Sequence, residues 1–109
     1  MAKDGVVDQP DETIHQPIRL KIMAALKALP EREKMEFTQV KALTGATDGN
    51  LGAHIGTLEQ AGYISVEKDF VGKKPRTRVQ LTKIGRRAFE KYVTFLREIV
   101  EANSDGRPQ

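Results

Sequence analysis

Two opposite helix signals lie close together near the middle of the chain. Gly45 is suited to end a helix, because glycine readily adopts the left-handed conformation that follows a last helical turn. Thr47 is suited to begin the next helix by accepting a backbone N–H, and Asp48 favours the positive end of its first turn. Two helices joined by so short a segment predict a helix-turn-helix.

Apolar spacing predicts the helices that precede this turn. Apolar residues at helical intervals, after a proline at the first position, indicate a helix over 17–29. Phe37 is expected in a brief extended segment that follows this helix. Thr38 is then expected to cap a second helix, which carries Val40 and Leu43 on its apolar face.

The helix after the turn is predicted over 47–61. Its core-facing stripe consists of Leu51, Ile55 and Leu58. Three glycines also lie within it, each costing about 1 kcal/mol relative to alanine; these are Gly49, Gly52 and Gly56. Two explanations are open: the glycines let this helix pack tightly against the first or second helix, or they let its outer face approach a large flat partner such as DNA.

After Gly62 the apolar pattern changes from helical spacing to alternation, which predicts a β-hairpin. The predicted inward face, interrupted by a lysine at position 68, consists of Ile64, Val66, Phe70, Thr77, Val79 and Leu81. The sequence VGKKPR is expected to form the turn, and Arg76, Arg78 and Gln80 to point outward.

A long helix is predicted over 83–102, with Thr82 as its N-cap. Its apolar stripe is too wide for one small domain to bury, which indicates packing against a second chain. Residues 1–12 are expected to form a flexible arm and 103–109 a flexible tail, leaving one domain over 13–102.

Charge and composition narrow the function. Residues 71–91 carry eight lysine and arginine side chains and one glutamate, a local excess of positive charge that suits a polyanion. The chain has no cysteine and two histidines distant in sequence, His15 and His54, so a disulfide framework or a metal site is not expected. No catalytic constellation is visible, and no apolar run is long enough to span a membrane. We expect a cytoplasmic protein that is not an enzyme and needs no cofactor.

Three stretches, in order, are GNLGAHIGTLEQAGYI, KKPRTRVQLT and LTKIG. With them, residues 14–101 resemble the small single-domain winged helix-turn-helix regulators of the MarR/ArsR-like group. The resemblance implies an α+β, mainly α fold with a two-stranded wing hairpin and a long C-terminal dimerisation helix. It implies a transcriptional regulator that binds double-stranded DNA as a homodimer, with half-sites about one turn apart. Helix 47–61 would lie in the major groove and residues 71–78 of the wing on the backbone or minor groove.

The expected DNA-binding residues combine this helix and the wing, and they are Thr47, Asp48, Asn50, Ala53, His54, Thr57, Lys73, Lys74, Arg76 and Arg78. Asn50 suits bidentate contact with adenine, and the lysines suit phosphates. The dimer interface is expected to use the first and last helices, at Ile18, Ile22, Tyr92, Phe95, Leu96, Ile99 and Val100.

Two other interpretations remain open. Few cations lie on helix 47–61, which favours a winged helix that binds an acidic protein partner. A sequence-tolerant protein that coats the chromosome would share the fold and the salt dependence. The sequence does not identify an effector, a DNA sequence or the direction of regulation.

Overall fold

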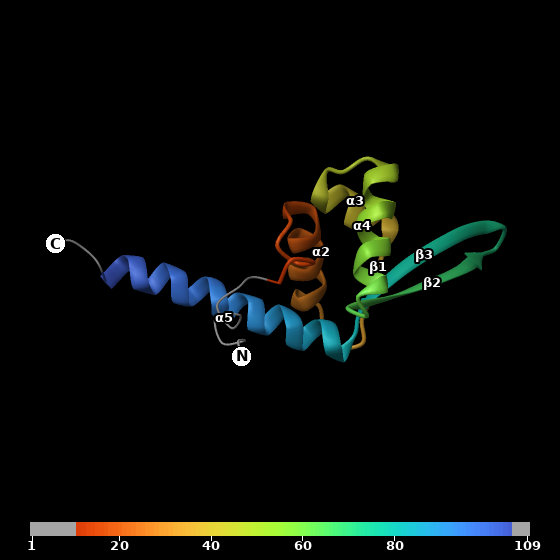
Figure 1. The fold of residues 1–109 in the computed structure, drawn as a ribbon. Helices are drawn as coiled ribbons and strands as arrows, with labels where there is room; N and C mark the ends of the chain where they lie inside the picture. The colour runs from red at the N-terminus through yellow and green to blue at the C-terminus, as the bar shows by residue number, and fades with distance from the viewer. Residues whose placement is uncertain (1–10, 106–109) are drawn as a thin grey trace.

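The computed structural model describes residues 11–105. Four helices and a three-stranded antiparallel sheet follow one another as α2 (Pro17–Ala28), β1 (Lys34–Glu36), α3 (Phe37–Thr44), α4 (Asp48–Gln60), β2 (Ile64–Val71), β3 (Lys74–Leu81) and α5 (Lys83–Asp105). The α+β, mainly α fold predicted from the sequence is confirmed. The wing, which is the β2–β3 hairpin, and α5 extend from opposite sides of the helical body (Figure 1).

Three of the predicted helix ends are confirmed by their capping contacts. Gly45 follows α3 in the left-handed conformation, with φ of 74°. The Thr47 hydroxyl accepts the Asn50 N–H at 3.2 Å at the start of α4. The Thr82 hydroxyl accepts the Gly85 N–H at 2.9 Å at the start of α5. Each signal was readable because it acts within four residues of chain.

The predicted start of the second helix was wrong. Phe37 is the first residue of α3 and not part of an extended segment, and the N-cap is Glu36 in place of Thr38. Glu36 and Gln39 form a capping box, in which the Gln39 side chain accepts the Glu36 N–H at 3.0 Å. This reciprocal pair satisfies two backbone donors, so the helix begins one residue after Glu36.

The strands of the wing are longer than predicted. Val71 pairs with Lys74 at the end of the hairpin, so the turn consists of Gly72 and Lys73 alone. Gly72 has a φ of 64°, which is the conformation such a two-residue turn requires at its first position. Pro75 belongs to β3 and not to the turn. It is accommodated because β1 pairs only with residues 78–80 of β3 and leaves the remaining edge open.

The core lies between α2, α3, α4 and the base of the sheet. Its fully buried side chains include Ile22, Met23, Leu26, Val40, Leu51, Leu58 and Val79. The start of α5 lies close against Tyr63, the residue before β2: a Cβ added at Gly85 would overlap the Tyr63 carbonyl oxygen. A glycine is therefore required where the last helix meets the segment between α4 and β2.

The segment before α2 is fixed to the body of the fold. Ile14 is buried, the Tyr63 hydroxyl donates to Asp11 at 2.6 Å, and His15 Nδ1 shares a hydrogen bond of 2.8 Å with the Tyr92 hydroxyl. Burial and the bond to Asp11 raise the pKa of Tyr63 to about 12. Asp11, at the end of the predicted flexible arm 1–12, is thus in contact with the domain, while residues 1–10 of that arm lie outside the described residues.

The last helix continues through Asp105, three residues beyond its predicted end. Residues 106–109 of the predicted tail lie outside the described part of the chain. No helix between residues 11 and 105 is both long and apolar enough to cross a membrane.

Candidate nucleic-acid interface

Much of the surface of α4 is exposed, and three glycines lie on it among polar side chains. A Cβ added at Gly49, Gly52 or Gly56 would meet no atom within 4 Å. The glycines therefore do not serve close packing against another helix of this chain, and that explanation from the sequence is wrong. They leave a shallow, exposed helix surface along which a partner can approach the backbone.

Most polar groups along the exposed side of α4 already have a partner. The Thr47 hydroxyl caps the helix, Asp48 pairs with Lys41 Nζ at 2.7 Å, and the Thr57 hydroxyl donates to the Ala53 carbonyl at 3.1 Å. The ion pair with Lys41 offsets the negative charge of Asp48. The Asn50 side chain has no partner among the described hydrogen bonds, so its amide is free to contact a ligand.

His54 lies at the side of α4 that faces α2. Its Nδ1 is 3.1 Å from Arg19 Nη1. Because a guanidinium only donates, Nδ1 must accept and the ring proton must lie on Nε2. Burial, followed by the charge of Arg19, lowers the pKa of His54. His54 is therefore a neutral N–H donor at pH 7, and no group of metal-ligating side chains surrounds it within the described residues.

The wing has two chemically different faces, set by its strand register. Glu67 lies opposite Arg78, and Asp69 lies opposite Arg76. Arg76 binds Asp69 with two hydrogen bonds of 2.9 and 2.8 Å, and Arg78 Nη2 lies 3.0 Å from Glu67 and 3.3 Å from Asp69. Lys34 of β1 also binds Glu67.

These contacts form an ion-pair network across the three strands. The hydrogen bond from Arg76 lowers the pKa of Asp69, and the bond from Lys34 lowers the pKa of Glu67. The network occupies the sheet face opposite Ile64 and Val79, which face the helices. Arg76 and Arg78, both expected at DNA, thus lie on the face turned away from α4 with their charges paired.

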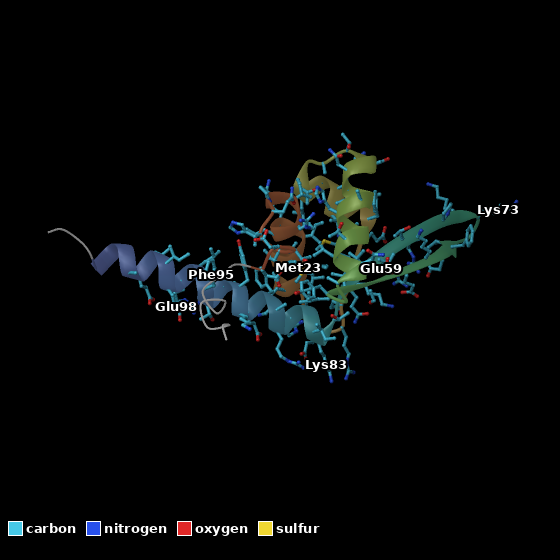
Figure 2. The ribbon with its side chains drawn as sticks, viewed as in Figure 1. Met23, Glu59, Lys73, Lys83, Phe95 and Glu98 are labelled. Atoms are coloured by element: carbon cyan, nitrogen blue, oxygen red, sulfur yellow. The ribbon has the colours of Figure 1, made fainter. Side chains whose placement is uncertain are left out.

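The remaining cations of the wing are not engaged in this way. Lys68, Lys73 and Lys74 are exposed, and none of them takes part in an ion pair within residues 11–105. Figure 2 shows Lys73 at the far end of the wing. Lys68 shares the face of Ile64 and Val66, on the side of the sheet where α4 packs. The alternation of the sequence already places Lys68 on that face, although as a lysine it interrupts the apolar pattern.

The residues expected at a dimer interface divide into two groups. Ile22 and Tyr92 are buried within the single chain, so they present no surface to a partner. Ile18, Phe95 and Leu96 are half-buried, and Ile99 and Val100 are 44% and 62% exposed. The unburied apolar surface lies on the second half of α5, which projects from the body beyond Phe95 (Figure 2).

Comparisons with known proteins agree with this architecture. The sequence pattern of a family described as a winged helix DNA-binding domain matches residues 18–100. The uncharacterized protein MJ0432 of Methanocaldococcus jannaschii is 36% identical over 76 residues, which are 70% of this chain and 79% of that protein.

Solved structures share the fold as well. A transcriptional regulator homologue from Pyrococcus horikoshii OT3 matches with a TM-score of 0.77 and 27% identity, over 94% of this chain and 97% of that one. A MarR family protein of Porphyromonas gingivalis W83 matches with a TM-score of 0.61 and 18% identity, over 88% of this chain and 86% of that one. This chain therefore belongs to the winged helix DNA-binding domain family, and its fold is that of MarR-type transcriptional regulators.

Proposed function

We propose that this chain regulates transcription as a homodimer, with α4 in the major groove of each half-site and residues 71–78 of the wing on the adjacent backbone or minor groove. The observation that carries the proposal is the open outer face of α4, where added Cβ atoms at three glycines would meet no neighbour. Such a face has no role in the core of the single chain. It suits a partner as wide and regular as a DNA groove.

The polar groups of α4 fit a specific kind of contact. Asn50 offers an amide that suits the N6 and N7 edge of adenine. The N-terminal end of α4 favours a phosphate, and Nε2–H of His54 is a further donor for the DNA backbone. Base readout would then depend chiefly on one side chain in each half-site, since Thr47, Asp48 and Thr57 are engaged within the chain.

The wing supplies the charge that α4 lacks. Lys73 and Lys74 extend at its far end, where long side chains reach phosphates on either side of a groove. Arg76 and Arg78 are held by Asp69 and Glu67. We assign these two arginines a supporting role: they keep the wing straight and contribute to DNA contact only if the carboxylates release them.

The homodimer is supported by the exposed apolar end of α5. Ile99 and Val100 continue the stripe of Phe95 and Leu96 past the point where the body of the protein covers it. A second copy related by a two-fold axis would cover the same stripe on both chains. The two copies of α4 would then face successive turns of one side of the duplex.

A selection from random duplex DNA at moderate salt tests the proposal, with the retained fraction sequenced and the mass of the free protein measured by light scattering. We expect a dimer and an enriched inverted repeat with half-sites about one turn apart. Retention without enrichment would indicate the sequence-tolerant coating protein, which the scarcity of base-reading side chains on α4 favours as the second candidate. No retention even at low salt would exclude DNA and favour an acidic protein partner.

A further inference from the structure

The far end of the wing carries an aromatic side chain that folding leaves uncovered. Phe70 is 68% exposed, more than any other exposed large hydrophobic residue between residues 11 and 105. Single exposed apolar residues are common on protein surfaces, so exposure alone assigns no role. Its position on the wing, and the charges around it, are what distinguish Phe70.

Phe70 lies on the face of the wing that continues the surface of α4. It pairs with Pro75 across the hairpin, just as Ile64 pairs with Leu81 and Val66 with Val79. Side chains at alternate positions share one face, and Ile64 and Val79 belong to the core that also contains Leu51 and Leu58 of α4. The wing extends past the helices (Figure 1). Phe70 is exposed near its end, on the same face as the core residues Ile64 and Val79.

The charges around Phe70 indicate what kind of partner suits it. Lys68 precedes it by two residues on the same face, and Lys73 lies in the turn; both are exposed and outside the ion pairs of the described residues, whereas Lys74, opposite Val71, lies on the other face. The carboxylates of the wing, Glu67 and Asp69, lie on the opposite face and are bound by arginines. An apolar side chain with a lysine on either side along the wing matches a polyanion with an apolar interior, which describes a DNA groove better than an apolar protein surface.

We propose that Phe70 acts as an apolar wedge that enters the minor groove of duplex DNA and bends the duplex, while Lys68 and Lys73 hold the phosphates on either side. Side chains of this type partly unstack a base step when they insert, and they favour flexible pyrimidine–purine steps. The rigid ring of Pro75 opposite Phe70 would limit the motion of the wedge. This inference rests on the proposed function. It adds Phe70 as a DNA contact and a bend in the duplex, neither of which is part of that proposal.

The chain provides a matched control in the next residue. Val71 is 56% exposed at the same end of the same strand, but it points to the opposite face. Both side chains are uncovered, so removing either one should leave the fold intact, which a thermal unfolding scan checks. The test compares the wild type with Phe70→Ala, Val71→Ala, Phe70→Leu and Lys73→Ala.

The experiment measures affinity for a duplex of about 30 base pairs, roughly three turns, at several salt concentrations. Bending of the same duplex is measured by energy transfer between dyes at its ends. We expect Phe70→Ala to abolish the bend and to lower the affinity about 10-fold or more, as loss of one buried aromatic group predicts, with the salt dependence unchanged. Phe70→Leu should restore most of the bend, and Val71→Ala should match the wild type. Lys73→Ala should instead reduce the slope of the salt dependence by about one for each subunit.

Two results would overturn the inference while leaving the proposed function in place. The first is a Phe70→Ala variant that binds and bends DNA like the wild type, which would favour a protein partner for Phe70. The second is an equal loss of affinity and bending in Val71→Ala, which would show that the face of the wing on which the side chain lies does not matter. A wild type that binds no duplex at low salt would overturn both the inference and the proposed function.

Discussion

Helix α4 and the wing contribute opposite properties to the proposed interface. The outer face of α4 lets a partner approach the helix backbone closely but carries little charge. Cβ atoms added at its three glycines would meet no neighbour, and the charge of Asp48 is offset by Lys41. The wing offers charge at a distance from the body, through Lys68, Lys73 and Lys74. The contrast suggests that the affinity for DNA comes mainly from the wing and that α4 contributes shape complementarity to the groove. The effects of salt, of substitutions and of pH test this division of roles.

The largest expected effect is that of salt. If each of two subunits contacts three to five phosphates, the dimer makes about 6–10 contacts, and its affinity should fall about 10³–10⁵-fold between about 50 and 200 mM salt. Fluorescence anisotropy of a labelled duplex measures this directly. A nearly flat response would mean that the lysines of the wing do not release counterions, and the division of roles would fail.

Reversing the charge at the end of the wing comes next. The double variant Lys73→Glu, Lys74→Glu should lower affinity for duplex DNA about 100-fold or more, because it removes two phosphate contacts in each subunit and adds repulsion. Dimer size should not change, since α5 is untouched. The control is Asp69→Asn with Arg76→Gln, which removes an ion pair at constant net charge. A change of less than about threefold is expected for this control.

The open face of α4 should respond to bulk without loss of stability. Gly52→Leu places a side chain where the structure has none, and we expect it to weaken DNA binding about 10-fold by holding the helix away from the groove. Urea unfolding should show equal or greater stability, because leucine favours a helix by up to about 1 kcal/mol over glycine. Unchanged binding by Gly52→Leu would remove α4 from the interface.

Gly85 provides the opposite case within the same molecule. Gly85→Ala should destabilise the fold by about 1–3 kcal/mol or more, because its Cβ would overlap the Tyr63 carbonyl. Gly52→Leu and Gly85→Ala should therefore change the free energy of unfolding in opposite directions, and the same urea unfolding experiment distinguishes them. A stable Gly85→Ala variant would show that the start of α5 can shift away from Tyr63.

A fall in pH gives the smallest effect and tests whether His54 of α4 stays uncharged. Because the native state lowers the pKa of His54, the unfolded state binds more protons just below about pH 6.5. Stability should therefore be full above about pH 6.5 and decrease as the pH falls toward the native pKa. Unfolding titrations at about pH 7.5 and about pH 5.5 measure the difference. His54→Gln should reduce the pH dependence, and an unchanged profile would mean that the Arg19 contact does not hold the ring neutral.

Signals that act over a few residues predicted most of the fold. Gly45, Thr47 and Thr82 end or begin helices through contacts with residues at most four positions away, and alternation identified the hairpin. The failures involve competing or distant partners. Glu36 displaced Thr38 as a cap because Gln39 reciprocates, and Gly85 matters only through the carbonyl of Tyr63, which lies 22 positions earlier.

The candidate site was predictable in its location but less so in its chemistry. The sequence indicated the helix and the basic wing, yet it weighted Arg76 and Arg78 equally with the lysines. Only the strand register reveals that Asp69 and Glu67 lie opposite these arginines. The same register assigns Lys68 and Phe70 to the α4 side, where alternation had set Phe70 among inward apolar residues. Whether a side chain at the end of a hairpin has anything to pack against depends on how far the helices extend.

The length of α5 has a consequence for the DNA site that does not depend on any residue in contact with DNA. It is a single helix of 23 residues, packed against Tyr63 at Gly85 and exposed over residues 97–102. In a homodimer joined through the C-terminal half of α5, the length of this helix would set the distance between the two copies of α4, like a ruler. One residue inserted before Phe95 would lengthen the ruler by about 1.5 Å and turn its apolar face by about 100°. The spacing between half-sites would then be encoded in a stretch of helix that touches no base.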